Sequence, residues 1–120
     1  MRIRITACLG GISMLDKPTV RQIAQRYAEK VSKELAPKSI ILFGSYANGN
    51  PHLYSDIDIA VVFNDYKDDW LDTAAFLQRL RRGIDDDTLG GIEPHLFDEA
   101  SDHSGFLAHI VEVGEVLYQS

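Results

Sequence analysis

A run of eight residues that begins with a pair of aspartates limits the folds open to this chain more than any other feature. Residues 56–63 read Asp-Ile-Asp-Ile-Ala-Val-Val-Phe, and every position after Asp58 is apolar. Apolar side chains on both faces are typical of a buried, central strand. Because strand side chains alternate between faces, Asp56 and Asp58 point the same way, with Cα atoms about 6.5–7 Å apart. The run predicts a buried strand with two carboxylates at its start.

These two carboxylates predict a cation site. Carboxylates this close repel each other unless cations lie between them. Mg²⁺ is held in proteins by one or two carboxylates together with substrate phosphates. A solvated turn before the strand would also explain Asp56. It explains Asp58 badly, because Asp58 lies between two isoleucines, where burial without a partner costs several kcal/mol. We therefore assign Asp56 and Asp58 as metal ligands.

A glycine turn precedes the aspartate pair. Residues 39–43 (Ser-Ile-Ile-Leu-Phe) predict a strand that ends at Gly44-Ser45. Gly44 allows a sharp turn whose backbone N–H groups can approach a phosphate, and Ser45 offers a hydroxyl to a phosphate oxygen. Taken alone, the pair would fit an ordinary turn at the end of a strand. Together with Asp56 and Asp58 it predicts a site for a nucleoside triphosphate.

Glu93 is the candidate third carboxylate. Residues 92–97 read Ile-Glu-Pro-His-Leu-Phe and predict a strand on which Glu93 and His95 share a face. If this strand lies beside residues 56–63, Glu93 reaches the metal site. Pro94 restricts the strand to an edge or a bulge. The alternative is an exposed edge glutamate, and His95 is a weaker candidate for a supporting role.

The remaining pattern predicts a layered α/β (α+β) fold. Three amphipathic segments predict helices: one from a cap at Asp16 or Thr19 to about residue 35, then residues 70–82 and 105–113. Helices that alternate with strands predict a sheet with the helices packed on one face. We expect Asp85-Asp86-Asp87 to form a solvated turn, and the arginines at 79, 81 and 82 to form an exposed helix end.

Length and composition bound the class of protein. We predict one domain over residues 14–120 and an N-terminal extension over residues 1–13, disordered or on the surface, with a short edge strand at 2–6 as the alternative. The net charge of −6 argues against direct binding of nucleic acid. No segment is apolar for long enough to cross a membrane. The single Cys8 excludes an intramolecular disulfide and fits a reducing compartment, so we expect a cytoplasmic protein.

The order glycine turn, hydroxyl, Asp-x-Asp resembles the nucleotidyltransferase superfamily of the polymerase β type. Within it, the chain from about Pro18 onward looks most like the minimal nucleotidyltransferases, which are often paired with a helical HEPN protein. The resemblance implies a mixed sheet, catalytic and metal-binding roles for Asp56, Asp58 and Glu93, and nucleotide binding at Gly44 and Ser45. It also implies two Mg²⁺ ions and ATP as substrate.

One position departs from the family pattern. Members commonly carry an arginine shortly after the Gly-Ser turn, whereas this chain has Asn48. If that arginine contacts phosphate, another residue such as Lys38 would have to supply the contact.

The resemblance implies that the chain transfers AMP from ATP to a hydroxyl on a partner protein, as the antitoxin of a HEPN-type toxin. Two alternatives stay open. A small-molecule nucleotidyltransferase of the aminoglycoside type would need a pocket built by dimerisation. A partner-binding antitoxin without catalysis would act by contact alone. Both a homo-oligomer and a hetero-oligomer are compatible with the sequence.

Overall fold

The computed structural model describes residues 17–44, 47, 56–86, 88 and 90–120. The expectations for residues 1–13, for Asp16 as a helix cap, for Ser45 and for Asn48 lie outside these residues.

Four strands form one mixed sheet in the order β3-β2-β1-β4. They are β1 (Ser39–Phe43), β2 (Ile57–Phe63), β3 (Ile92–Asp98) and β4 (Glu115–Gln119). β1 is antiparallel to β2 and β4, whereas β2 and β3 are parallel. The prediction of β2 as an internal strand and of the Pro94 strand as an edge strand is confirmed. Parallel pairing brings the starts of β2 and β3 together at one end of the sheet.

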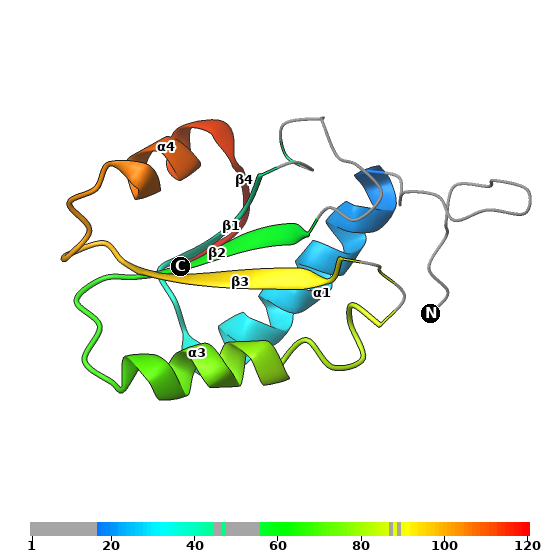
Figure 1. Ribbon diagram of the computed structural model, residues 1–120, viewed down its shortest axis with the longest axis horizontal. Coiled ribbons are helices and arrows are strands. Elements are labelled where there is room, and N and C mark those ends of the chain that lie inside the picture. The colour runs from blue at the N-terminus through cyan, green and yellow to red at the C-terminus, as the bar shows by residue number, and fades with distance from the viewer. Residues whose placement is uncertain (1–16, 45–46, 48–55, 87, 89) are drawn as a thin grey trace, which may run out of the picture.

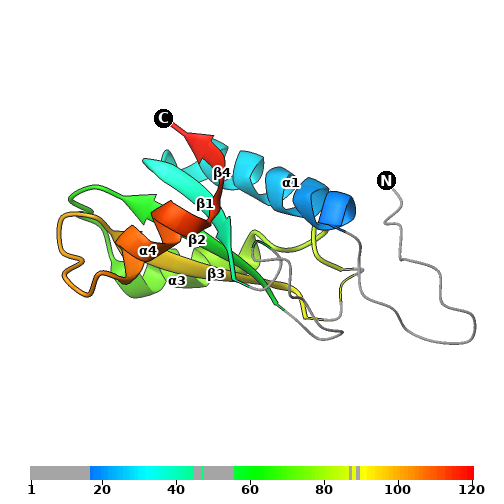
Figure 2. The ribbon, with the colours of Figure 1, turned by 90° about the horizontal axis from the view of Figure 1, so that it is seen from above.

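The helices lie on both sides of the sheet (Figure 1). α1 (Lys17–Leu35) and α3 (Trp70–Arg79) cover one face, and α4 (Phe106–Val113) lies on the other. The larger apolar cluster joins α1 and α3 to β2 residues such as Ile59 and Val61, and the smaller joins α4 to Ala60 and Val62. The expected helical layer on one face is formed by α1 and α3. Viewed from above, α4 lies over the strands as partial cover of the opposite face (Figure 2).

The helix boundaries follow local chemistry with two differences from the prediction. Thr19 lies inside α1, which begins at Lys17 and accepts Pro18 in its first turn. α3 ends at Arg79 instead of residue 82, because the next amides bond three residues back: Arg81 N to Gln78 O and Arg82 N to Arg79 O. These 3₁₀-type bonds tighten the last turn and end the helix.

The strand β4 was not predicted from the sequence. It is held by α1 as well as by β1. Arg21 Nε and Nη2 donate to the carboxylate of Glu115 at 2.5 and 3.1 Å, and the amide of Gln25 donates to Leu117 O at 3.1 Å. The hydrogen bond from Arg21 and its charge lower the pKa of Glu115. Contacts to a helix almost a hundred residues earlier hold this short strand in place.

One polar group in the core is anchored between the two helices of the larger layer. Tyr27 of α1 is fully buried, and its hydroxyl donates to Leu77 O of α3 at 2.7 Å. Burial raises the pKa of Tyr27 far above its usual range. Within the described part of the chain, no helix is long and apolar enough to cross a membrane.

Candidate active site

Asp58 and Glu93 are direct neighbours on the parallel strands β2 and β3. The register pairs Ile57 with Ile92 and Asp58 with Glu93. Paired residues share a face of the sheet, and here it is the α4 side, because Asp58 alternates with Ile57 and Ile59 of the opposite cluster. Asp58 is half-buried and Glu93 is exposed. The prediction that the 92–97 strand lies beside 56–63 is confirmed, and two of the three predicted carboxylates stand together.

Asp56 lies immediately before β2 and is half-buried. The amide of Ile57 donates to Gly91 O at 2.8 Å, so the start of β2 is tied to the residue that precedes β3. This bond fixes the backbone directly after Asp56. Asp56 therefore lies at the same end of the sheet as the other two predicted carboxylates, Asp58 and Glu93.

Gly44 faces Asp58 across the sheet edge. Gly44 follows Phe43, the register partner of Asp58 on β1, and has φ +79°. A Cβ at this position would overlap Oδ2 of Asp58 and stand 3.0 Å from its Cγ. Glycine is therefore required at position 44 for two reasons. The backbone is left-handed there, and the carboxylate of Asp58 occupies the space of a side chain. Ser45, the other predicted nucleotide contact, lies outside the described residues.

His95 fixes the other oxygen of the same carboxylate. Its Nε2 lies 3.1 Å from Oδ1 of Asp58, and since an ionised carboxylate only accepts, Nε2 donates. The imidazole packs edge-on against the ring of Phe43, with centroids 5.1 Å apart. The Asp58 and His95 side chains retain 25% and 34% exposure. The sequence signal for His95 was its place two residues after Glu93, on the same face.

The donor set suits a hard cation. Carboxylate oxygens are the ligands that Mg²⁺ prefers, and one or two of them suffice when substrate phosphates complete the shell. Gly44 leaves Oδ2 of Asp58 unobstructed by a side chain at that position. Among the described residues as placed, no group of three or more His, Cys, Asp or Glu residues is arranged to hold a metal ion by itself. Asp58 and Glu93 therefore offer carboxylate oxygens to a cation without forming a complete ligand set.

Lys38 cannot replace the missing family arginine. It precedes β1 at the end of the sheet away from Gly44, and its Nζ pairs with Glu99 Oε1 at 2.5 Å. Gly44 lies six residues after Lys38 along the strand, a distance of roughly 20 Å at 3.3 Å per residue. The suggestion that Lys38 contacts the nucleotide is wrong, because the strand carries it to the opposite end.

Comparison with known families decides the identity of the fold. Residues 25–120 match the family model described as polymerase beta, nucleotidyltransferase. The chain belongs to this family. The nucleotidyltransferase shows no significant match to any curated protein.

Solved structures agree with this assignment. A protein described as a nucleotidyltransferase from Sulfolobus solfataricus has the same fold, with a TM-score of 0.62, 22% identity, and 86% of this chain and 83% of that chain covered. A mutant of the toxin–antitoxin MntA-HpeT gives 0.56 and 27% identity, and a toxin–antitoxin with AMP-PNP gives 0.57 and 29%. Each of these two matches covers 80% of this chain and 73% of the other. The resemblance to minimal nucleotidyltransferases is confirmed.

Proposed function

We propose that the nucleotidyltransferase transfers AMP from ATP to a hydroxyl of a partner protein and acts as the antitoxin of a toxin–antitoxin pair. The observation that carries the proposal is the pairing of Asp58 with Glu93 on neighbouring strands. The absence of a side chain at Gly44 leaves room for the Asp58 carboxylate. Neither carboxylate belongs to the larger core cluster of the described residues, because both lie on the α4 side. Two aligned carboxylates at this position suit a metal ion that binds phosphate.

Each residue has a role in that chemistry. The turn at Gly44 would present backbone N–H groups to the phosphates, with Ser45 adding a hydroxyl. Asp56, Asp58 and Glu93 would hold Mg²⁺, which when bound neutralises phosphate charge and lowers the pKa of an attacking hydroxyl. In the reaction, the acceptor oxygen bonds to the α-phosphorus as the bond to the β-phosphate oxygen breaks, and pyrophosphate leaves. The acceptor proton passes to Glu93 or to water.

A macromolecular acceptor suits the exposure of the site. Glu93 is exposed on an edge strand, and α4 contacts mainly β1, so a hydroxyl on another protein can approach. Support for an antitoxin role comes from the two toxin–antitoxin structures, one of them with AMP-PNP. We infer a HEPN-type toxin as the partner, a tyrosine hydroxyl as the acceptor, and the cytoplasm as the location.

The test is transfer of label from α-³²P-ATP with Mg²⁺, to the chain alone and to the chain with the protein encoded beside it. We expect label on the neighbouring protein, and loss of at least 100-fold of that label in Asp58→Asn and in Glu93→Gln. Glu112→Gln, an exposed carboxylate on α4, is the matched control and should transfer normally.

Two results would contradict the proposal. Absence of label with all four nucleoside triphosphates, while the two proteins form a tight complex, would identify a non-catalytic binding module. Label on an added aminoglycoside instead of the protein would identify a small-molecule enzyme.

A further inference from the structure

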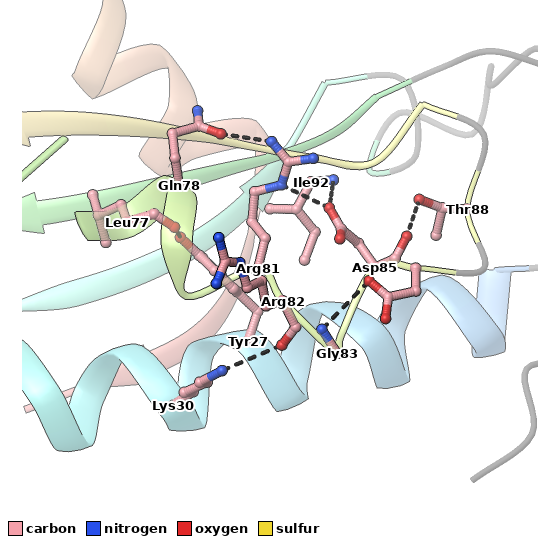
Figure 3. Close-up of polar contacts among 11 residues, drawn as sticks. Tyr27, Lys30, Leu77, Gln78, Arg81, Arg82, Gly83, Asp85, Thr88 and Ile92 are labelled. Atoms are coloured by element: carbon pink, nitrogen blue, oxygen red, sulfur yellow. Dashed lines mark hydrogen bonds and ion pairs between the residues drawn. The ribbon is translucent and has the colours of Figure 1, made fainter. Parts of the chain in front are cut away.

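A second site lies between α1 and the turn that follows α3, on the side of the sheet away from the carboxylates. It is an open groove of about 360 Å³. Four cations and two carboxylates line it: Arg26, Lys30, Lys33, Arg82, Glu29 and Glu34. Figure 3 shows Lys30 on α1 reaching the turn that carries Arg82 and Gly83. We call this surface the basic groove.

Two of the cations are held in place without losing their charge. Arg26 Nη2 donates to Gly83 O, and Lys30 Nζ donates to Arg82 O, both at 3.3 Å. These acceptors are neutral carbonyls. In the described part of the chain, none of the four cations of the basic groove forms an ion pair with a carboxylate. With four cations and two carboxylates, the groove carries a net positive charge, and two of its cations are held by backbone carbonyls.

A buried carboxylate holds the turn that forms one wall. Asp85 is buried, and its Oδ2 accepts from Arg81 Nε and from the amide of Ile92, both at 2.8 Å. Figure 3 shows this pair beside the turn that carries Arg82 and Gly83, with Asp85 bonded to both Arg81 and Ile92. The expectation of a fully solvated acidic turn is wrong at Asp85. Arg81 likewise belongs to this pair and does not form part of a free helix end. These contacts tie the turn to the start of β3.

Charge distinguishes the groove from the rest of the molecule. The chain carries a net charge of −6, whereas the groove combines four cations with two carboxylates. A local positive region on an acidic protein attracts an acidic surface over about one Debye length, about 8 Å at physiological ionic strength.

We propose that the basic groove docks an acidic helix of a partner protein. Arg26, Lys30 and Lys33 recur at i, i+4 and i+7, so they lie along one face of α1 over roughly 10 Å. A helix with Glu at the same spacing matches that rise. Glu29 and Glu34 would repel a polyphosphate but can pair with basic residues that flank the acidic stripe. The mixed lining favours a protein partner over nucleic acid or a nucleotide.

Docking here leaves the carboxylate face open. α1 and α3 pack on one face of the sheet, whereas Asp58 and Glu93 point to the α4 side. A partner held in the groove would not block nucleotide entry. The inference is independent of the proposed function, because docking requires no nucleotide and is measured without one.

The experiment uses a fluorescein-labelled, alanine-rich helical peptide with Glu at i, i+4 and i+7 and flanking Lys. A peptide of the same composition, with Glu scattered around the helix, is its control. By fluorescence anisotropy at 50 mM NaCl we expect the striped peptide to bind at least tenfold more tightly than the scattered one. We expect binding to weaken at 200 mM NaCl.

Variants assign the binding to the groove. Lys30→Glu with Lys33→Glu should weaken binding at least tenfold, and Lys30→Gln with Lys33→Gln provides a milder pair if charge reversal disturbs folding. Lys67→Glu, which changes an exposed cation outside the groove, should bind as the wild type does. Equal affinity for the two peptides, or equal binding by the groove variants, would overturn the proposal. Tighter, groove-dependent binding of inorganic polyphosphate would overturn it in favour of a phosphate site.

Discussion

The carboxylate of Asp58 lies directly against Gly44 and occupies the space that a Cβ on residue 44 would fill. The contact joins the end of β1 to the start of β2. On the other side of the same carboxylate, His95 of β3 donates to Oδ1. Three strands thus meet at one side chain. The orientation of Asp58 is set by its surroundings, and variants of these neighbours should change the chemistry more than the stability.

The change Gly44→Ala should abolish nucleotidyl transfer. The added methyl overlaps Oδ2 of Asp58, and the φ of +79° costs an L-residue about 1 to 2 kcal/mol. We expect AMP transfer to fall at least 100-fold while the protein remains folded by circular dichroism.

Gly105→Ala is the matched control for this variant. Gly105 has φ +82°, so the backbone strain is similar, but a Cβ there meets nothing within 4 Å. It should lose comparable stability in urea and keep its transfer rate. Equal loss of activity in both variants would show that backbone strain alone, and not displacement of Asp58, explains the effect.

The change His95→Ala should reduce transfer about tenfold, equivalent to about 1.4 kcal/mol. The effect is modest because Asp58 and His95 are both partly exposed, and water can replace the lost donor. His95→Asn, which can still donate to the carboxylate, should recover part of the rate. The exposed His109 on α4 is the control, and His109→Ala should behave as the wild type. A rate unchanged in His95→Ala would remove His95 from the site.

The change Asp85→Ala should destabilise the protein by about 2 to 3 kcal/mol. It leaves the amide of Ile92 without its acceptor and Arg81 without its carboxylate partner. Urea unfolding measures the loss. Asp86→Ala alters the exposed neighbour and should cost less than about 0.5 kcal/mol. Similar midpoints for the two variants would mean that Asp85 contributes no more than a surface residue.

Acid should weaken the contribution of Asp98. Partial burial alone would raise the pKa of Asp98, but hydrogen bonds from the amides of Ala100, Asp65 and Tyr66 outweigh it, and the pKa is lowered. The stabilisation is therefore complete above the ordinary aspartate pKa of about 3.9 and is lost as pH falls through the lower folded value. The difference in Tm between wild type and Asp98→Asn should be largest near pH 6 and shrink below pH 4. A difference that stays constant from pH 6 to pH 3 would contradict this.

The local elements could be predicted because their signals are local. A continuous apolar run defines β2, the spacing of Val20, Ile23, Tyr27 and Val31 defines α1, and Gly44 marks the end of β1. Burial of these side chains needs only the period of the element to be right. The Asp-x-Asp pair and the glycine turn could be recognised as one motif because they lie within about fifteen residues of each other.

Some features could not be predicted because they depend on contacts between distant segments. Nothing local distinguishes Asp85 from its solvated neighbours, yet one carboxylate oxygen meets Arg81 and the amide of Ile92. The strand β4 is short and becomes stable only against β1 and the Arg21 side chain.

The sequence by itself determined the family and named the candidate site residues, since short motifs fix which atoms are available. The tertiary structure decided which of them meet. The register of β2 against β3 places Glu93 beside Asp58 and brings His95 to Oδ1. That register follows from packing both strands onto α1 and α3, a constraint shared by residues far apart in the chain, and no single segment encodes it.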